Sequence, residues 1–300
     1  MNYRLLLVIA ALGACSTGED SRETGAANAP APNADSATRI AVEALPEDSA
    51  IVEQRLAWAR EQRLDTVPIG KAIAAFGRTF VGAPYVPGTL EVPGPERLVV
   101  NLRTFDCVTF VENMLALART TRSGGHYPEF KRELMRIRYR DGKLDGYPSR
   151  LHYFSEWIAD NDRKGIVKTI TQSLGGKPDP EPITFMTEHR ASYRQLADSA
   201  VFRTIGEMEK RLSAIPRYVI PESEIAQHAA GIQDGDVIAA ASNLPGLDIA
   251  HTGLALWVDG KLHLMHAPLV GSVVEISEVP LADRILSIKA QDGIMVSRPQ

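Results

Sequence analysis

The strongest chemical signal in this chain is a cysteine that stands at the expected start of a helix. Cys107 follows two candidate N-cap residues, Thr104 and Asp106, and precedes a long apolar segment. A helix N-terminus carries partial positive charge, which favours a thiolate and lowers the pKa of a thiol, although a neighbouring Asp106 carboxylate opposes this shift. A thiolate nucleophile also needs a base within hydrogen-bonding reach.

Two histidines in the C-terminal part can supply that base. His251 opens an apolar run, an Asp259-Gly260 pair follows, and His266 closes the next run. Asp-Gly between two apolar runs predicts a β-hairpin, which brings His251 and His266 to the same end of two strands. One imidazole can then orient the other, as in a nucleophile–base–orienter triad. His263 is the other candidate orienter, but side chains alternate along a strand, so only one of the two shares the face of His251.

The same residues allow two other interpretations. Cys107 can be a small buried hydrophobic residue with no chemical role. His251, His263 and His266 can be zinc ligands, but the sequence has neither an HExxH helix nor an obvious carboxylate ligand beside them. We therefore expect no metal and no cofactor.

The elements that must position these residues change character along the chain. Apolar residues recur at helical spacing between residues 47 and 80, which predicts helices there. The segment that begins at Cys107 is apolar around much of its circumference, as in a buried helix. Residues 126–213 are mostly helical in pattern, with a helix pair at 186–213. After Pro216 the pattern favours strands. We expect strands at 217–220, 235–239, 251–257, 262–267, 273–276 and 285–288. Helices followed by an antiparallel sheet indicate an α+β fold.

The N-terminus has the pattern of an export signal. Arg4 precedes a short apolar run that ends in Leu12-Gly13-Ala14-Cys15, which resembles a bacterial lipobox. We expect residues 1–14 to be removed as a signal peptide, Cys15 to carry lipid, and 15–46 to form a disordered tether. The alternative is an ordinary signal peptide that is cut nearby. With lipid on Cys15, we expect the protein to be an exported lipoprotein of the cell envelope, on the periplasmic side of the outer membrane if the source is Gram-negative.

Composition excludes several other classes of protein. The 300 residues include 33 basic and 37 acidic side chains and have a formal net charge of −4, which gives no electrostatic basis for binding nucleic acid. No apolar run approaches the ~20 residues that a membrane-spanning helix needs. Two cysteines cannot build a disulfide scaffold.

Several segments together resemble a known group of hydrolases. Three of them resemble the NlpC/P60 superfamily of papain-like cell-wall hydrolases: FDCVTFVE at 105–112, HTGLAL at 251–256 and MHAP at 265–268. Three more resemble its DUF1460 branch of N-acetylmuramoyl-L-alanine amidase-like proteins: PYVPGTLE at 84–91, YPSRLHYFSEWIADN at 147–161 and GLDIAHTG at 246–253. The resemblance covers essentially the whole expected domain.

This resemblance implies a single papain-like catalytic domain over 47–300, with the catalytic helix packed on the sheet and a helical insertion at about 126–213 that walls the cleft. It implies Cys107 as nucleophile, His251 as general base and His266 as orienter. Tyr85 matches a tyrosine beside the nucleophile, and Asp106 matches an acidic residue that contacts the peptide.

The resemblance also implies a substrate, either peptidoglycan or a muropeptide. The expected reaction is hydrolysis of the N-acetylmuramoyl-L-alanine amide bond. The alternative is an endopeptidase that uses the same triad to cut the stem peptide at L-Ala-γ-D-Glu or at a later bond. A non-catalytic lipoprotein that binds muropeptides is the third possibility.

Overall fold

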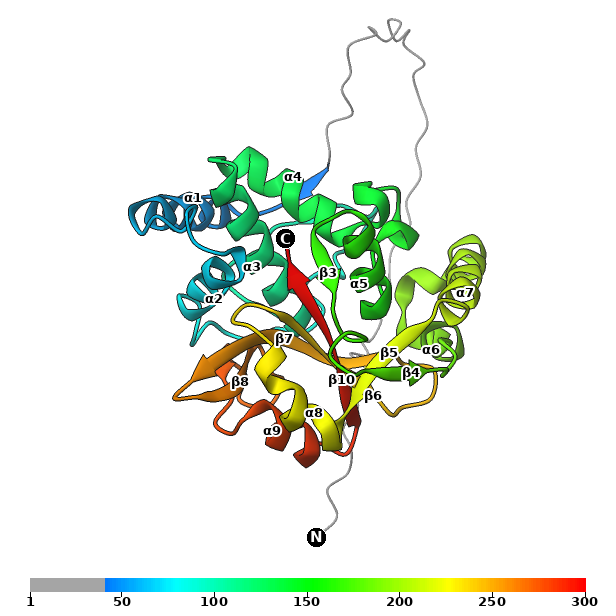
Figure 1. Cartoon of the computed structure of the whole chain (residues 1–300). Coiled ribbons are helices and arrows are strands. Elements are labelled where there is room, and N and C mark those ends of the chain that lie inside the picture. Colours follow the sequence, from blue (N-terminus) through cyan, green and yellow to red (C-terminus); the bar gives the residue numbers. More distant parts are fainter. Residues whose placement is uncertain (1–40) are drawn as a thin grey trace, which may run out of the picture.

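The computed structural model describes residues 41–300, and within them helices dominate the first half and strands the second (Figure 1). Short 3₁₀ turns link several of these elements. The helices are α1 (Pro46–Glu61), α2 (Ile69–Arg78), α3 (Cys107–Arg122), α4 (Tyr127–Arg138), α5 (Phe154–Arg163), α6 (Phe185–Glu188), α7 (Ser199–Ser213), α8 (Ile225–His228) and α9 (Leu281–Ser287). None of these helices is long and apolar enough to span a membrane.

The strands of the second half form one antiparallel sheet in the order β4-β5-β10-β6-β7-β8-β9, and β3 pairs with β10. Separately, β1 and β2 form a short parallel pair. This arrangement confirms the α+β prediction. The strands are β1 (Val42–Glu43), β2 (Leu98–Val99), β3 (Val167–Thr169), β4 (Lys177–Asp179), β5 (Arg217–Pro221), β6 (Val237–Ser242), β7 (Ile249–Val258), β8 (Lys261–His266), β9 (Glu275–Ile276) and β10 (Gln291–Pro299).

The sheet separates two layers of helices. Figure 1 shows α1–α5 on one side of the sheet and α8 and α9 on the other. Alternate residues of β6 follow this division: Val237 and Ala239 pack into the core with α1–α5, whereas Ile238 and Ala240 pack with α8 and α9. The period of two in a β-strand thus gives the sheet two apolar faces.

Helix α3 is the centre of the larger core, as its apolar girth predicts. Phe110, Val111 and Ala116 are fully buried, although they point in different directions from the helix axis. The buried Glu112 is paired with Arg138 of α4, whose Nε lies 2.7 Å from the carboxylate. This pair fixes α3 against α4, and removal of one partner would leave an uncompensated buried charge.

The hairpin that carries the two histidines forms at the predicted turn. Asp259 and Gly260 both have positive φ, 49° and 76°, as a two-residue turn between twisted strands requires. Strands β7 and β8 pair from Val258 with Lys261 to Leu254 with Met265. The register is therefore set by a local sequence signal at the turn.

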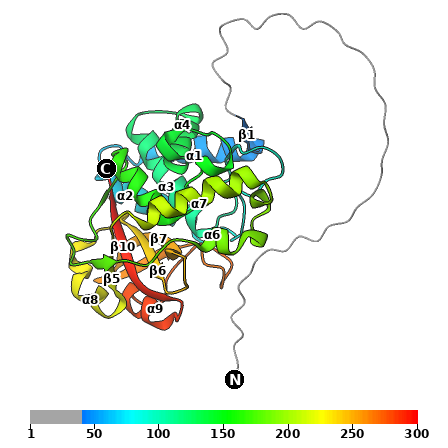
Figure 2. The same ribbon diagram turned by 90° about the vertical axis from the view of Figure 1, so that its right-hand side faces the viewer.

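Only part of the helical insertion predicted at 126–213 forms a small core of its own, because α4 and α5 pack into the larger core with α3. Tyr147, Tyr153, Met186 and Leu196 belong to a buried cluster that also includes residues of α7. Figure 2 shows α7 running across the molecule with α6 beside it. The segment 186–213 is less helical than predicted, because only α7 is a long helix and α6 is a single short turn before two 3₁₀ turns.

The end of the chain differs from the prediction in two ways. Residues 285–288, predicted as a strand, fall largely in α9, where Leu281 and Ile285 are one turn apart and both fully buried. The strand β10, which the sequence analysis missed, occupies a central position between β5 and β6. Its apolar run is only Ile294–Val296, so local pattern gives little sign of a central strand.

The end of the predicted tether already belongs to the fold. Residues 15–46 were expected to form a tether, yet Val42–Glu43 pair with Leu98–Val99, and α1 begins at Pro46. This pairing depends on a segment more than fifty residues away, which a local absence of apolar periodicity cannot reveal. The predicted signal peptide, Cys15 and the rest of the predicted tether up to residue 40 lie outside the described residues.

Candidate active site

Cys107 is the first residue of α3, and the preceding residue caps the helix. The Asp106 carboxylate accepts hydrogen bonds from the Thr109 backbone N–H and hydroxyl at 2.8 and 2.9 Å. In return, the Asp106 N–H donates to the Thr109 hydroxyl at 2.9 Å. This capping box identifies Asp106 rather than Thr104 as the N-cap and fixes the position of the cysteine backbone. The predicted contact of Asp106 with the peptide stays a prediction.

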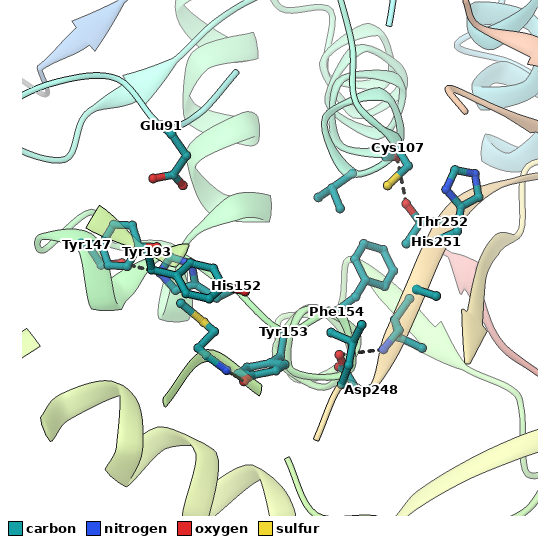
Figure 3. Close-up of a pocket in the computed structure, with 15 residues that line it drawn as sticks. Glu91, Cys107, Tyr147, His152, Tyr153, Phe154, Tyr193, Asp248, His251 and Thr252 are labelled. Atoms are coloured by element: carbon teal, nitrogen blue, oxygen red, sulfur yellow. Dashed lines mark hydrogen bonds between the residues drawn. The ribbon is translucent and has the colours of Figure 1, made fainter. Parts of the chain in front are cut away.

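A side-chain bond from the sheet holds the start of α3 next to the histidine strand. The Thr252 hydroxyl donates to the Cys107 carbonyl at 2.8 Å. Figure 3 shows Cys107, Thr252 and His251 together at one end of a pocket of about 160 Å³, which all three residues line. Thr252 was not singled out from the sequence, although it stands in the HTG segment beside His251.

The two predicted histidines are in direct contact. His251 Nε2 lies 2.8 Å from His266 Nδ1, and the rings are nearly perpendicular at 87°. His266 is completely buried. His263 pairs with Leu256 and projects from the other face, where its Nδ1 lies 2.8 Å from the Ser277 carbonyl. The geometry therefore brings together His251 and His266 and places His263 elsewhere.

This separation also bears on the zinc interpretation. Within residues 41–300, no group of three histidine, cysteine or acidic side chains is arranged to hold a metal ion. The three histidines of the zinc interpretation do not converge, because His263 faces away from the other two.

Burial controls the protonation of the candidate nucleophile and base. Burial, followed by the nearby Asp106 charge, raises the pKa of Cys107 to about 11. Burial, followed by the positive charge of Arg284, lowers the pKa of His251 to about 3. The expectation of a lowered thiol pKa was wrong, because desolvation outweighs the partial charge of the helix terminus. The resting pair is a neutral thiol beside a neutral imidazole.

Tyr85 lies close enough to Cys107 and Asp106 to interact with their charges. Burial, followed by the negative forms of Cys107 and Asp106, raises the pKa of Tyr85 to about 12. The backbone of Tyr85 is fixed by a bridge to Phe105 and by donation of its N–H to the Ser272 carbonyl at 2.7 Å. Its phenol therefore keeps its proton at neutral pH and can donate a hydrogen bond.

The insertion and the loop after α2 form the far end of the pocket. Tyr147 and Tyr193 lie there together with Glu91, opposite Cys107 (Figure 3). The Glu91 carboxylate is bonded to Arg150 and, at 2.7 Å, to the Gln195 amide. These contacts join the loop to the insertion, as the expected wall of the cleft requires.

Asp248 attaches the insertion to β7. It is buried, and its carboxylate accepts the N–H of Ser155, in the first turn of α5, at 2.7 Å. A carboxylate at a helix N-terminus is a favourable arrangement. Sequence reasoning did not assign Asp248 a role, although it lies three residues before His251.

Comparison with known proteins identifies the family of this chain. A model of the AmiA-like family, described as N-acetylmuramoyl-L-alanine amidase-like, matches residues 75–294. The chain belongs to this amidase-like family. No curated protein matches it.

Solved structures similar to this amidase-like chain include proteins of different names. An N-acetylmuramoyl-L-alanine amidase from Bacteroides uniformis is 37% identical, with a TM-score of 0.75, and the match covers 77% of this chain and 99% of that one. A putative xylanase from Bacteroides fragilis is 36% identical, with a TM-score of 0.72, over 75% and 99%. A DUF1460 protein from Legionella pneumophila is 21% identical, with a TM-score of 0.62, over 84% and 94%, and shows a shared fold.

The close approach of β7 and β8 at the two histidines leaves no room for a side chain at Gly253. A Cβ at Gly253 would lie 2.9 Å from the His266 Cβ and 2.9 Å from the Met265 carbonyl oxygen. Backbone cannot retreat as a flexible side chain can, so Gly253→Ala should push β8 away from β7. We expect a fall of about tenfold or more in kcat/KM together with a lower thermal midpoint. Unchanged activity and midpoint in this variant would show that the strands have room here.

Histidines that stay neutral in the folded protein should make it sensitive to acid. Burial, and then the charge of Arg150, lowers the pKa of His152 far below its usual value. A histidine with a lowered folded-state pKa takes up its proton only on unfolding, so its stabilising contribution is complete above about pH 6.5 and is lost as the pH falls. His152→Gln removes this effect while keeping a side-chain N–H donor for the Tyr147 carbonyl.

The measurement is urea unfolding at about pH 6.5, 5.5 and 4.5. We expect the unfolding free energy of the wild type to fall more steeply than that of His152→Gln, by up to about 1.4 kcal/mol per pH unit. Titrations of other groups cancel in the difference between the two proteins. Parallel curves would contradict the neutral buried state of His152.

Proposed function

We propose that this protein is an exported cysteine amidase that hydrolyses the N-acetylmuramoyl-L-alanine bond of peptidoglycan or of muropeptides, with a papain-like NlpC/P60 fold. Cys107 acts as nucleophile, His251 as general base and His266 as orienter. The observation that carries the proposal is the contact between His251 of β7 and His266 of β8. Strand β7 is also hydrogen-bonded, through Thr252, to the Cys107 carbonyl at the start of α3.

The neutral resting pair determines the first step. The thiol proton moves from Cys107 to His251 Nδ1, because Nε2 is engaged with His266. The thiolate then attacks the amide carbonyl carbon. Backbone N–H groups at the start of α3, together with the Tyr85 phenol, then stabilise the oxyanion.

The second half of the reaction reverses the proton path. His251 gives its proton to the leaving amine of L-alanine, and the C–N bond breaks to leave a thioester on Cys107. Water, deprotonated by His251, attacks the thioester carbonyl. The muramoyl lactyl carboxylate and the free thiol are the products.

The pocket lining supports placing an uncharged acyl group inside. Among the residues that line this pocket, Glu91 and Asp248 are the acidic side chains, and no lysine or arginine is present to bind the carboxylate of the stem peptide. Tyr147, Tyr153 and Tyr193 supply aromatic walls. The N-acetylmuramoyl part fits this chemistry better than the anionic peptide, which then points outward.

A glycosidase, as the name of one structural neighbour suggests, needs two carboxylates that are available to the substrate. Glu91 is bonded to Arg150 and Gln195, and Asp248 accepts two backbone N–H groups. These carboxylates hold loops together, so the pocket favours the thiol chemistry.

Mass spectrometry of digested muropeptides tests the proposal directly. An amidase releases a peptide that begins with L-alanine, whereas the endopeptidase alternative leaves L-alanine on the muramic acid. Cys107→Ala is the matched control for contaminating hydrolases. Products that retain L-alanine on the sugar would replace the amidase by the endopeptidase, and no products from either bond would contradict both.

Anchoring through a lipid on Cys15 belongs to the same proposal. Cys15→Ser should move the protein from the membrane fraction to a soluble fraction or leave it unprocessed, because the lipid cannot be attached without the thiol. The measurement is cell fractionation followed by the intact mass. A variant that remains in the membrane fraction at the processed mass would refute lipid anchoring.

A further inference from the structure

The hydrogen bond between the two histidines fixes where His266 carries its proton. For His251 to accept the thiol proton on Nδ1, its own proton must be on Nε2, which then donates to His266 Nδ1. A neutral His266 that accepts on Nδ1 must therefore carry its proton on Nε2. The base function of His251 thus requires the Nε2–H tautomer of His266.

The Nε2–H group of His266 has no hydrogen-bond partner in the resting site, although the side chain is completely buried. An unpaired buried donor is costly. The carboxylate beside it belongs to Glu275 of β9, whose Oε1 lies 3.6 Å from Nε2. Glu275 pairs directly with His266 in the register of β8 and β9. A shift of about 0.7 Å would bring this pair to ordinary hydrogen-bond length.

The charges around the histidine pair give the carboxylate a second effect. Arg284 of α9 lies near both imidazoles and disfavours the protonated form of His251. Glu275 is close enough to interact with Arg284, and it also faces the exposed Glu278. Without Glu275, the imidazolium formed in the first step would face the Arg284 cation alone. With Glu275, a negative charge lies beside His266 Nε2, on the opposite edge of the ring from His251.

We propose that Glu275 is a positioning residue for the reaction: its carboxylate accepts the Nε2–H of His266, holds the tautomer that His251 needs, and offsets the charge of Arg284 when His251 takes the proton from Cys107. Glu275 does not contact the substrate, and it acts through His266. The inference rests on the proposed function only in its use of Cys107 and His251 as nucleophile and base.

The test separates charge from structure by comparing Glu275→Gln, which keeps the size, with Glu275→Asp, which keeps the charge. Glu278→Gln is the matched control, because Glu278 is an exposed carboxylate near Glu275, whereas the strand register pairs Glu275 with His266. The full chain carries Cys15→Ser in every variant, so that Cys107 is its only thiol. The rate of Cys107 alkylation by iodoacetamide is measured from about pH 5 to about pH 9, together with muropeptide hydrolysis and the thermal midpoint.

We expect Glu275→Gln to slow alkylation near pH 7 by about fivefold or more and to lower kcat by about tenfold, with little change in KM. Glu275→Asp should recover part of both rates, and Glu278→Gln should match the parent protein. Parent rates in Glu275→Gln would overturn the proposal. Equal losses in Gln and Asp, accompanied by equal falls in midpoint, would also overturn it, because they indicate a structural role.

The alkylation readout does not depend on the substrate. If alkylation slows as expected while the parent protein hydrolyses no muropeptide, the role of Glu275 stands and the amidase assignment fails. If muropeptides are cleaved by the parent and by Glu275→Gln at the same rate, the amidase assignment stands and the role of Glu275 fails.

Discussion

Replacement of Cys107 by serine is expected to lower kcat/KM for muropeptides by several orders of magnitude without unfolding the protein. The exchange of sulfur for oxygen is nearly isosteric, and the cap and the Thr252 bond engage backbone and neighbouring side chains rather than the thiol. A serine hydroxyl is far harder to deprotonate than a thiol, so the same imidazole base activates it much less. Turnover and thermal midpoint should be measured on the same preparation.

The alternative, in which Cys107 is merely a packed side chain, gives the opposite pattern. A hydroxyl placed in an apolar site without a partner costs about 1–3 kcal/mol. The variant would then be less stable and would keep its activity per folded molecule. A destabilised but active Cys107→Ser protein would refute the nucleophile assignment.

Replacement of His266 by alanine should lower kcat/KM by about tenfold or more. The variant leaves the Nε2–H of His251 without its acceptor, and the imidazole can then rotate or adopt the tautomer that blocks proton transfer. Orienting groups act through the base, so the loss should be smaller than for Cys107→Ser. The pH profile of kcat/KM should change as well.

His263→Ala is the matched control for His266→Ala, because both residues belong to β8 and both are buried. His263 bonds to the Ser277 carbonyl on the opposite face of the sheet, so its removal should affect stability more than turnover. If His263→Ala proved the more damaging for kcat/KM, the register of β7 and β8 would have to differ by one residue.

The features that the sequence determined by itself are those with short-range physical causes. The Asp106 cap acts within one helical turn, so the position of Cys107 at the start of α3 could be predicted. Asp259-Gly260 specifies its hairpin locally, and the alternation of side chains then allows only one of His266 and His263 to share the face of His251. The α+β class follows from the same local periodicities.

Other features were decided only by the tertiary structure. The pKa of Cys107 is raised because packing removes water from a helix terminus that would otherwise favour the thiolate. The strand β10 and the pairing of Val42–Glu43 depend on partners far away in the chain.

The pocket itself also depends on tertiary structure, because Glu91, Tyr147 and Tyr193 converge from separate segments. The contact of Glu275 with His266 exists because β9 pairs with β8 after an intervening loop, which no motif records. Local sequence specifies caps, turns and alternation because these depend on neighbouring residues. Desolvation and long-range contact depend on how the whole chain packs, and they decide the charge state of the candidate site.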